Sequence, residues 1–164
     1  MNSTSITENT SSIKSTITDV KQLVKVGLSL SVVFSSVAGY LLAVETVNYV
    51  TLTLLAFGGF LMVGASNAFN QIIEIDTDAL MQRTKSRPLP TGRMSVNLAL
   101  TIAILFAVIG LGILYYINAK SALFGAISIF LYTSAYTPLK SVTPLTVFGG
   151  AIPGTIHVLL LWVA

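Results

Sequence analysis

Seven charged side chains are concentrated in one stretch of an otherwise apolar sequence, residues 67–93. Three of the six carboxylates lie there within five positions, and four of the nine basic residues follow: Glu74, Asp76, Asp78, Arg83, Lys85, Arg87 and Arg93. Asn70 precedes this run, so that Asn70, Glu74 and Asp78 are spaced at i, i+4 and i+8. Each step of four residues turns a helix by only about 40° beyond a full turn, which places the three side chains along one side of a helix.

Two carboxylates and an amide oxygen on one helix face form a set of hard oxygen donors. The two carboxylates repel each other near lipid depth unless a cation lies between them. Mg²⁺ suits such donors because it keeps several waters and shares the rest of its shell with phosphate oxygens. The pattern therefore predicts a metal site at Asn70, Glu74 and Asp78. Asp76 ranks lower because it points about 200° away from Glu74, and Gln71 is a secondary polar candidate.

The basic run directly after the acids adds positive charge that suits phosphate oxygens. Carboxylates for a metal, followed by Arg83, Lys85 and Arg87, predict a diphosphate site. Pro88 and Pro90 should end the helix, so that the basic segment forms a loop able to fold over the site. The alternative is a solvated loop that merely follows the positive-inside rule. The position of the acids at the end of a span, rather than in mid-loop, favours the metal site.

The composition around this stretch is that of an integral membrane protein. Of the 164 residues, 54% are hydrophobic and 9% are charged, whereas an ordinary soluble domain has about 25% charged residues. The expected fold is all-α, with a polar, disordered tail at 1–22 and a transmembrane domain at 23–164. The apolar runs predict about five membrane-spanning helices, at about 24–43, 49–69, 96–117, 121–136 and 143–164.

The basic residues also predict how the chain is oriented in the lipid bilayer. With the N-terminus in the cytoplasm, eight of the nine lie on the inside and only Lys120 lies outside. This predicts a multi-pass membrane protein with the 67–93 stretch at its cytoplasmic face. The expected membrane is the cell membrane, the inner membrane of a bacterium. The net charge of +3 is explained in this way without a nucleic-acid partner. The absence of cysteine excludes thiolate chemistry.

Two blocks of the sequence resemble the UbiA-type intramembrane prenyltransferases. The run from Asn70 through Glu74 and Asp78 to Arg93 is similar to the first acidic motif of that family. The run from Tyr136 to Gly154, with its Thr-Pro and Gly-Gly pairs, is similar to a second block, and the two together favour the branch that farnesylates haem. The resemblance covers about residues 23–164. It implies a partial UbiA-type helical bundle around a central cavity that opens toward the cytoplasm and the lipid.

The resemblance implies a reaction and a role for each site residue. Farnesyl diphosphate would donate its farnesyl group to a vinyl group of haem b, giving haem O, with Mg²⁺ bridging the acids to the diphosphate. A quinone-precursor aromatic is the alternative acceptor. The implied metal-holding, catalytic residues are Asn70, Glu74 and Asp78, and the implied diphosphate-binding residues are Arg83, Lys85, Arg87 and Lys140.

One departure from the family limits this interpretation. The prenyltransferases carry a second acidic motif on a later helix, whereas no acidic residue follows Asp78 in this chain. We therefore expect the N-terminal part of such an enzyme, which needs a complementing C-terminal half; haem A synthase is a further expected partner. A non-catalytic remnant or split-enzyme half is the alternative, and a small cation transporter using Glu74 and Asp78 is disfavoured by the adjacent basic residues. His157 fits a buried or interface residue better than a haem ligand.

Overall fold

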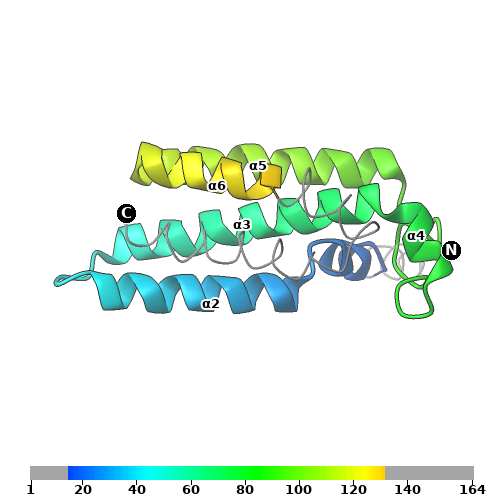
Figure 1. The fold of residues 1–164 in the computed structure, drawn as a ribbon, viewed down its shortest axis with the longest axis horizontal. Coiled ribbons are helices and arrows are strands. Elements are labelled where there is room, and N and C mark those ends of the chain that lie inside the picture. Colours follow the sequence, from blue (N-terminus) through cyan, green and yellow to red (C-terminus); the bar gives the residue numbers. More distant parts are fainter. Residues whose placement is uncertain (1–14, 132–164) are drawn as a thin grey trace, which may run out of the picture.

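Helices form all the regular structure in the part of the chain that the structure describes, residues 15–131. The structure is a computed structural model, and it supports the predicted all-α class. A helix at 15–23 comes first. The elements after it are α2 (Val26–Ala43), α3 (Tyr49–Ile73), α4 (Ile75–Leu80), α5 (Val96–Ile117) and α6 (Ala119–Leu131). Figure 1 shows α2, α3, α5 and α6 side by side, with the short α4 at one end of the bundle. Helix α3 lies in the middle and contacts the other three.

Three of these helices are long and apolar enough to cross a bilayer. They are α2 with 18 residues, α3 with 25 and α5 with 22, and the hydrocarbon core needs about 20 residues. Side chains on their outer faces are apolar and exposed, such as Phe34 and Val108, as expected for a surface that contacts lipid. Helix α6 begins two residues before the expected fourth span. The rest of that span and the expected fifth span, 143–164, lie outside the described residues.

Polar residues begin two of the spans. The side chain of Asn48 accepts hydrogen bonds from the backbone N–H groups of Val50 (3.0 Å) and Thr51 (3.2 Å) at the start of α3. Ser95 does the same at the start of α5, where its hydroxyl accepts from Leu98 N–H at 3.3 Å. Such N-caps satisfy backbone donors that have no partner within the helix. They fix where the spans begin and hence which residues reach the membrane surface.

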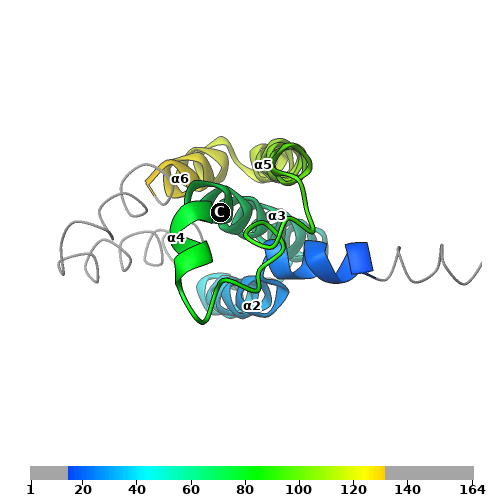
Figure 2. The same ribbon diagram turned by 90° about the vertical axis from the view of Figure 1, so that its right-hand side faces the viewer.

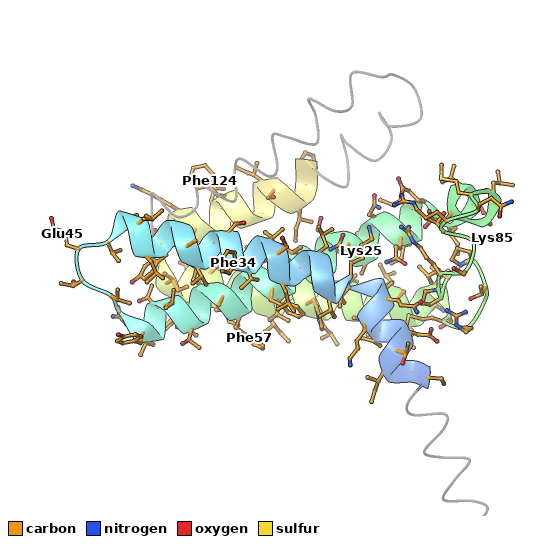
Figure 3. The ribbon with its side chains drawn as sticks, turned by 90° about the horizontal axis from the view of Figure 1, so that it is seen from below. Lys25, Phe34, Glu45, Phe57, Lys85 and Phe124 are labelled. Carbon is orange, nitrogen blue, oxygen red and sulfur yellow. The ribbon has the colours of Figure 1, made fainter. Side chains whose placement is uncertain are left out.

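The N-terminal tail departs in part from the expectation. We expected disorder throughout 1–22. Residues 1–14 lie outside the described residues, but residues 15–23 form a helix. Leu23 is fully buried, and it packs in one cluster with Ala68, Met94 and Ala103, with Val20 against the same cluster. Burial of these apolar side chains offsets the entropy of ordering a segment rich in Ser and Thr. Figures 2 and 3 show this helix running across the direction of the spans and away from the bundle.

Glycines bring α3 and α5 into close contact. A Cβ atom added at Gly110 of α5 would lie 3.1 Å from Leu61 Cβ and 3.0 Å from Met62 Cγ on α3, closer than ordinary contact. Gly58 and Gly64 of α3 meet α5 side chains in the same way. Small residues allow membrane helices to approach closely, where dispersion replaces the hydrophobic effect as the source of attraction. The α3–α5 pair is thus the fixed framework from which the polar end of α3 projects.

Candidate active site

The predicted acidic residues lie where α3 passes into α4. Glu74 separates the two helices, with φ −92° and ψ 11°. The backbone nevertheless keeps its helical pairing, because Glu74 N–H donates to Asn70 C=O (3.0 Å) and Asp78 N–H donates to Glu74 C=O (2.7 Å). The spacing of four therefore continues across the junction. Asn70, Glu74 and Asp78 follow one another along the same helical path, at the end of the bundle where α4 lies (Figure 1).

Asn70 and Glu74 are joined directly by their side chains. The amide Nδ2 of Asn70 donates a hydrogen bond to Glu74 Oε2 at 3.0 Å. Asn70 is buried, with 4% of its surface exposed, while Glu74 is half-buried. The contact gives the Glu74 carboxylate a fixed position at the edge of the protein interior. The Asn70 amide and the Glu74 carboxylate therefore lie next to each other.

Asp78 is held by a salt bridge instead. Arg87 Nη1 lies 2.5 Å from Asp78 Oδ2, and the side chains are 21% and 5% exposed respectively. The Thr84 hydroxyl donates to the backbone carbonyl of Asp78 at 3.0 Å, so the loop after α4 is fastened to the acidic helix twice. Buried Pro88 and Leu89 anchor the far side of this loop. The basic segment folds back over the acids, and Arg87 is the residue that reaches them.

The other basic residues of the loop point elsewhere. Arg83 and Lys85 are exposed, and Figure 3 shows Lys85 at the end of the molecule opposite Glu45. Arg93 turns to the N-terminal helix, where its Nε donates to Asp19 Oδ1 at 3.0 Å. Asp76 is exposed, in keeping with its lower rank in the sequence. Lys140, the fourth predicted diphosphate ligand, lies outside the described residues.

Two further amides of α3 hold the N-terminal helix against this site. Gln71 Nε2 donates to the backbone carbonyls of Gln22 (3.1 Å) and Leu23 (2.7 Å). Asn67 Nδ2 donates to Val24 C=O at 3.4 Å. These carbonyls end a helix and lack partners within it. We ranked Gln71 as a secondary contact of the acids, but its amide nitrogen caps the helix at 15–23. The feature of the sequence that could have indicated this capping is the pair of amides, Asn67 and Gln71, four residues apart within an apolar run.

The donor set fits a magnesium ion that shares its shell with phosphate. Residues 15–131 contain no cluster of three or more His, Cys, Asp or Glu side chains suited to a metal. The predicted set has only two carboxylates, Glu74 and Asp78, with the Asn70 amide beside them. Mg²⁺ is usually bound through one or two carboxylates, with waters and substrate phosphates completing its shell. These three residues could therefore hold Mg²⁺ once Asp78 separates from Arg87.

Comparison with known proteins places the chain in a family. The model of the UbiA prenyltransferase family matches residues 32–164, which include the acids and the basic loop. The chain belongs to the UbiA prenyltransferase family. The match confirms the resemblance found in the sequence. The match begins within α2, so the helix at 15–23 lies outside it.

Individual members of the UbiA family show which branch the chain resembles. It is 65% identical over 150 residues to a protoheme IX farnesyltransferase of Christiangramia forsetii, covering 92% of this chain and 50% of the relative. Its sequence identity to the protoheme IX farnesyltransferase of Flavobacterium psychrophilum is 62% over 155 residues, covering 93% of this chain and 52% of the relative. Its identity to that of Listeria welshimeri is 33% over 166 residues, covering 93% of this chain and 54% of the relative. The chain thus spans about half the length of the curated relatives it matches.

A solved structure supports the UbiA-type fold independently. The chain superimposes with a TM-score of 0.81 on a structure from a study of digeranylgeranylglyceryl phosphate synthase in membranes. The sequences are 20% identical, and the match covers 88% of this chain and 52% of the other. At that identity the likeness shows the fold alone. It agrees with the helical bundle and the membrane spans described above.

Proposed function

We propose that this chain supplies part of the active site of an enzyme that transfers a farnesyl group from farnesyl diphosphate to haem b, giving haem O. The relatives that match it at 62% and 65% identity are protoheme IX farnesyltransferases, which supports this acceptor over a quinone-precursor aromatic. The observation that carries the proposal is the contact of Arg87 with Asp78 at the end of the helical series Asn70, Glu74 and Asp78. This contact brings a guanidinium, which can bind phosphate, to oxygen donors of the kind that bind Mg²⁺.

Asn70, Glu74 and Asp78 would hold Mg²⁺, which when bound neutralises the charge that develops on the leaving diphosphate. Arg87 has a different task. Its guanidinium can bond phosphate oxygens in a bidentate manner, and we infer that it exchanges Asp78 for the diphosphate when the carboxylate turns to the metal. Arg83 and Lys85 on the same loop, together with Lys140, would add positive charge around the diphosphate.

The proposed reaction breaks the bond between C1 of the farnesyl group and the diphosphate oxygen, and the electron pair leaves with the diphosphate. The terminal carbon of a haem vinyl group then bonds to the farnesyl cation. Water adds to the neighbouring carbon, which carries the positive charge, and loses a proton to give the hydroxyethylfarnesyl group. This chain contributes to the departure of the diphosphate, because its charged residues would stabilise the negative charge that develops on that leaving group. A complementing C-terminal half would supply a second acidic motif.

The setting of the reaction is also part of the proposal. The chain is a multi-pass membrane protein, and we place its N-terminus in the cytoplasm from the positive-inside distribution of its basic residues. We place it in a bacterial inner membrane because the relatives that match it come from bacteria. The acids and the basic loop then lie at the cytoplasmic face, where a water-soluble diphosphate group can reach them. Haem A synthase would be a partner that receives haem O.

A chimera tests the proposed function. The matching 150 residues of the Christiangramia forsetii relative are replaced by this chain, and the protein is produced in a bacterial membrane that makes no haem O. Membranes receive haem b, farnesyl diphosphate and Mg²⁺, and extracted haems are separated and weighed by mass spectrometry. We expect haem O, abolished by chelating the metal. Asp78→Asn should lower the rate by about 10²-fold or more, while Asp76→Asn, an exposed neighbour, should change it by about twofold or less.

Two results would contradict the proposal. A chimera that is inserted and stable but forms no haem O would exclude haem as acceptor, and prenylation of a quinone-precursor aromatic by the same membranes would establish the alternative. Equal losses in Asp78→Asn and Asp76→Asn would remove Asp78 from the metal site. The unmodified relative, produced in parallel, controls for the host and the assay.

A further inference from the structure

A pocket lined by several charged side chains lies beside the candidate active site. It has a volume of about 980 Å³ and opens between the helix at 15–23, the start of α2 and the loop after α4. None of the three predicted metal-holding residues lines it. We propose that this pocket binds the phosphate headgroup of an anionic phospholipid. The proposal goes beyond farnesyl transfer and does not depend on it.

The charge of the lining favours an anion. Four cationic side chains line the pocket, namely Lys21, Lys25, Arg87 and Arg93. Asp19 is the single carboxylate in the lining. Serine and threonine hydroxyls from the N-terminal helix and Ser86 add hydrogen-bond donors at its wall. Phosphate oxygens bond to such groups, and charge-assisted hydrogen bonds are the strong ones. The pocket therefore has both the charge and the donors that a phosphate needs.

The two guanidinium groups are already held in place. Arg93 bonds Asp19 Oδ1 at 3.0 Å and the Ser86 carbonyl at 3.0 Å, and Arg87 bonds Asp78. A guanidinium has five N–H donors, so one that bonds a carboxylate still has donors left for a phosphate. Side chains fixed in advance lose less entropy when a ligand binds. The carboxylates therefore orient the cations at the pocket.

The turn at Lys25 brings the lysines to the same pocket. Lys25 has φ 48°, the one positive φ outside glycine among the described residues. This left-handed turn joins the helix at 15–23 to α2, and it is stabilised by bonds from Ser29 Oγ (2.8 Å) and Asn67 Nδ2 (3.4 Å) to Val24 C=O. A left-handed residue just after a helix is a common way to end it and to redirect the chain. Here it places Lys21 and Lys25 on one lining.

The position of the pocket favours a lipid over a soluble phosphate. Its wall includes Val26, Gly27 and Leu28, the first turn of a membrane span. Leu28 is 49% exposed and Phe34, further along α2, is 75% exposed. Figure 3 shows Lys25 where the N-terminal helix meets α2. A headgroup in the pocket thus has its acyl chains against the lipid-facing side of α2. Basic clusters beside a membrane helix attract anionic lipids in this way.

Retention of lipid by the purified chain tests the proposal. The chain of residues 1–164 is placed in phosphatidylcholine nanodiscs that contain some phosphatidylglycerol, and the lipids that remain bound are counted by native mass spectrometry. Lys21→Gln should lower phosphatidylglycerol retention by about fivefold, the effect of one lysine near an anionic surface. Lys120→Gln is the charge-matched control, because Lys120 does not line the pocket. It should leave retention within about twofold of the native chain.

Four outcomes decide the matter. A loss confined to Lys21→Gln, and larger in Lys21→Gln/Lys25→Gln, supports the headgroup site. Equal losses in Lys21→Gln and Lys120→Gln overturn it, because they show general attraction to a charged surface. Inorganic phosphate in excess separates the two sources of the same chemistry: unchanged lipid retention supports a lipid site, and displacement overturns it in favour of a soluble phosphate. Circular dichroism checks that each variant is folded. If the variant that includes Lys25→Gln misfolds, Lys21→Gln alone still decides the test, because Lys21 is exposed.

Discussion

Replacing Arg87 by methionine should destabilise the protein by about 2–3 kcal/mol. The substitution keeps much of the side-chain length but leaves the Asp78 carboxylate, 5% exposed, without the guanidinium that now bonds it. Removing one partner of a buried ion pair costs about 3–5 kcal/mol, because the other charge remains buried. Arg87 itself is 21% exposed, so water can enter after the substitution and screen the carboxylate. The expected loss is therefore at or below the lower end of that range.

Unfolding of the purified chain in detergent micelles measures this loss. The helical circular dichroism signal is followed against denaturant for the native chain, Arg87→Met and Arg83→Met. The control removes the same charge from the same loop at an exposed position, and should change the free energy of unfolding by about 0.5 kcal/mol or less. Equal losses in the two variants would refute the reasoning, since the effect would then come from loop charge and not from the pair.

The same variant also tests whether Asp78 can hold a metal. Without Arg87, the carboxylate is open to Mg²⁺, so Mg²⁺ alone should raise the stability of Arg87→Met more than that of the native chain, in which the guanidinium bonds Asp78. Ligand at a hundred times its dissociation constant stabilises the folded state by about 2.7 kcal/mol. Arg87→Met/Asp78→Asn should lose this gain. A gain that survives Asp78→Asn would show that the metal binds elsewhere.

Two further substitutions test how the site is supported. Gln71→Leu removes hydrogen bonds to the carbonyls of Gln22 and Leu23, but it also removes a buried Oε1 that accepts no hydrogen bond. The free energy of unfolding should therefore fall by only about 1 kcal/mol. Amide hydrogen exchange should become faster in residues 15–23, and unchanged exchange there would contradict the capping role. Gly110→Ala should cost about 1–3 kcal/mol through contact with Leu61 and Met62. Gly112→Ala, with open space around it, should be neutral or stabilising by up to about 1 kcal/mol in thermal unfolding, and equal effects at both glycines would argue against close α3–α5 packing.

The membrane spans could be predicted because the bilayer sets a simple rule. About 20 apolar residues are needed to cross it, and the ranges of α2 and α5 follow directly from the apolar runs. The end of α3 could not be read in this way. We expected the span to end at 69, but α3 continues to Ile73 because Asn70 and Gln71 are buried within the protein. Hydropathy assigns polar residues to the exterior, whereas these two find partners inside.

The N-terminal helix illustrates a second limit. Its composition, rich in Ser and Thr, predicted disorder. Its stability depends on partners far along the chain: Gln71 bonds carbonyls 48 and 49 residues earlier, and Arg93 bonds Asp19, 74 residues away. A short apolar pattern, Val20 and Leu23, was present but too brief to outweigh composition. Only the tertiary contacts decide whether such a segment can offset the entropy of ordering.

The order of the acidic residues along the helix could be predicted, but the partner of each could not. Helical geometry alone fixes the series Asn70, Glu74 and Asp78. Three basic residues compete for Asp78 in the sequence, and the path of the loop selects Arg87. That path depends on Leu89 packing in the same buried cluster as Met94 and on Met94 N–H bonding Pro88 C=O at 3.2 Å. These contacts are made by apolar residues, and nothing in their sequence indicates which basic residue will pair with Asp78.

The Arg87–Asp78 contact also bears on the cation-transport hypothesis. A transporter needs Glu74 and Asp78 to exchange a mobile cation freely, but a fixed guanidinium already bonds Asp78. A cation that displaced it would leave Arg87, only 21% exposed, without its anion, at a cost comparable to that of breaking the pair. A metal that arrives with a diphosphate avoids this cost, because the diphosphate gives Arg87 a new anionic partner. The geometry therefore favours joint binding of metal and phosphate over passage of a bare cation.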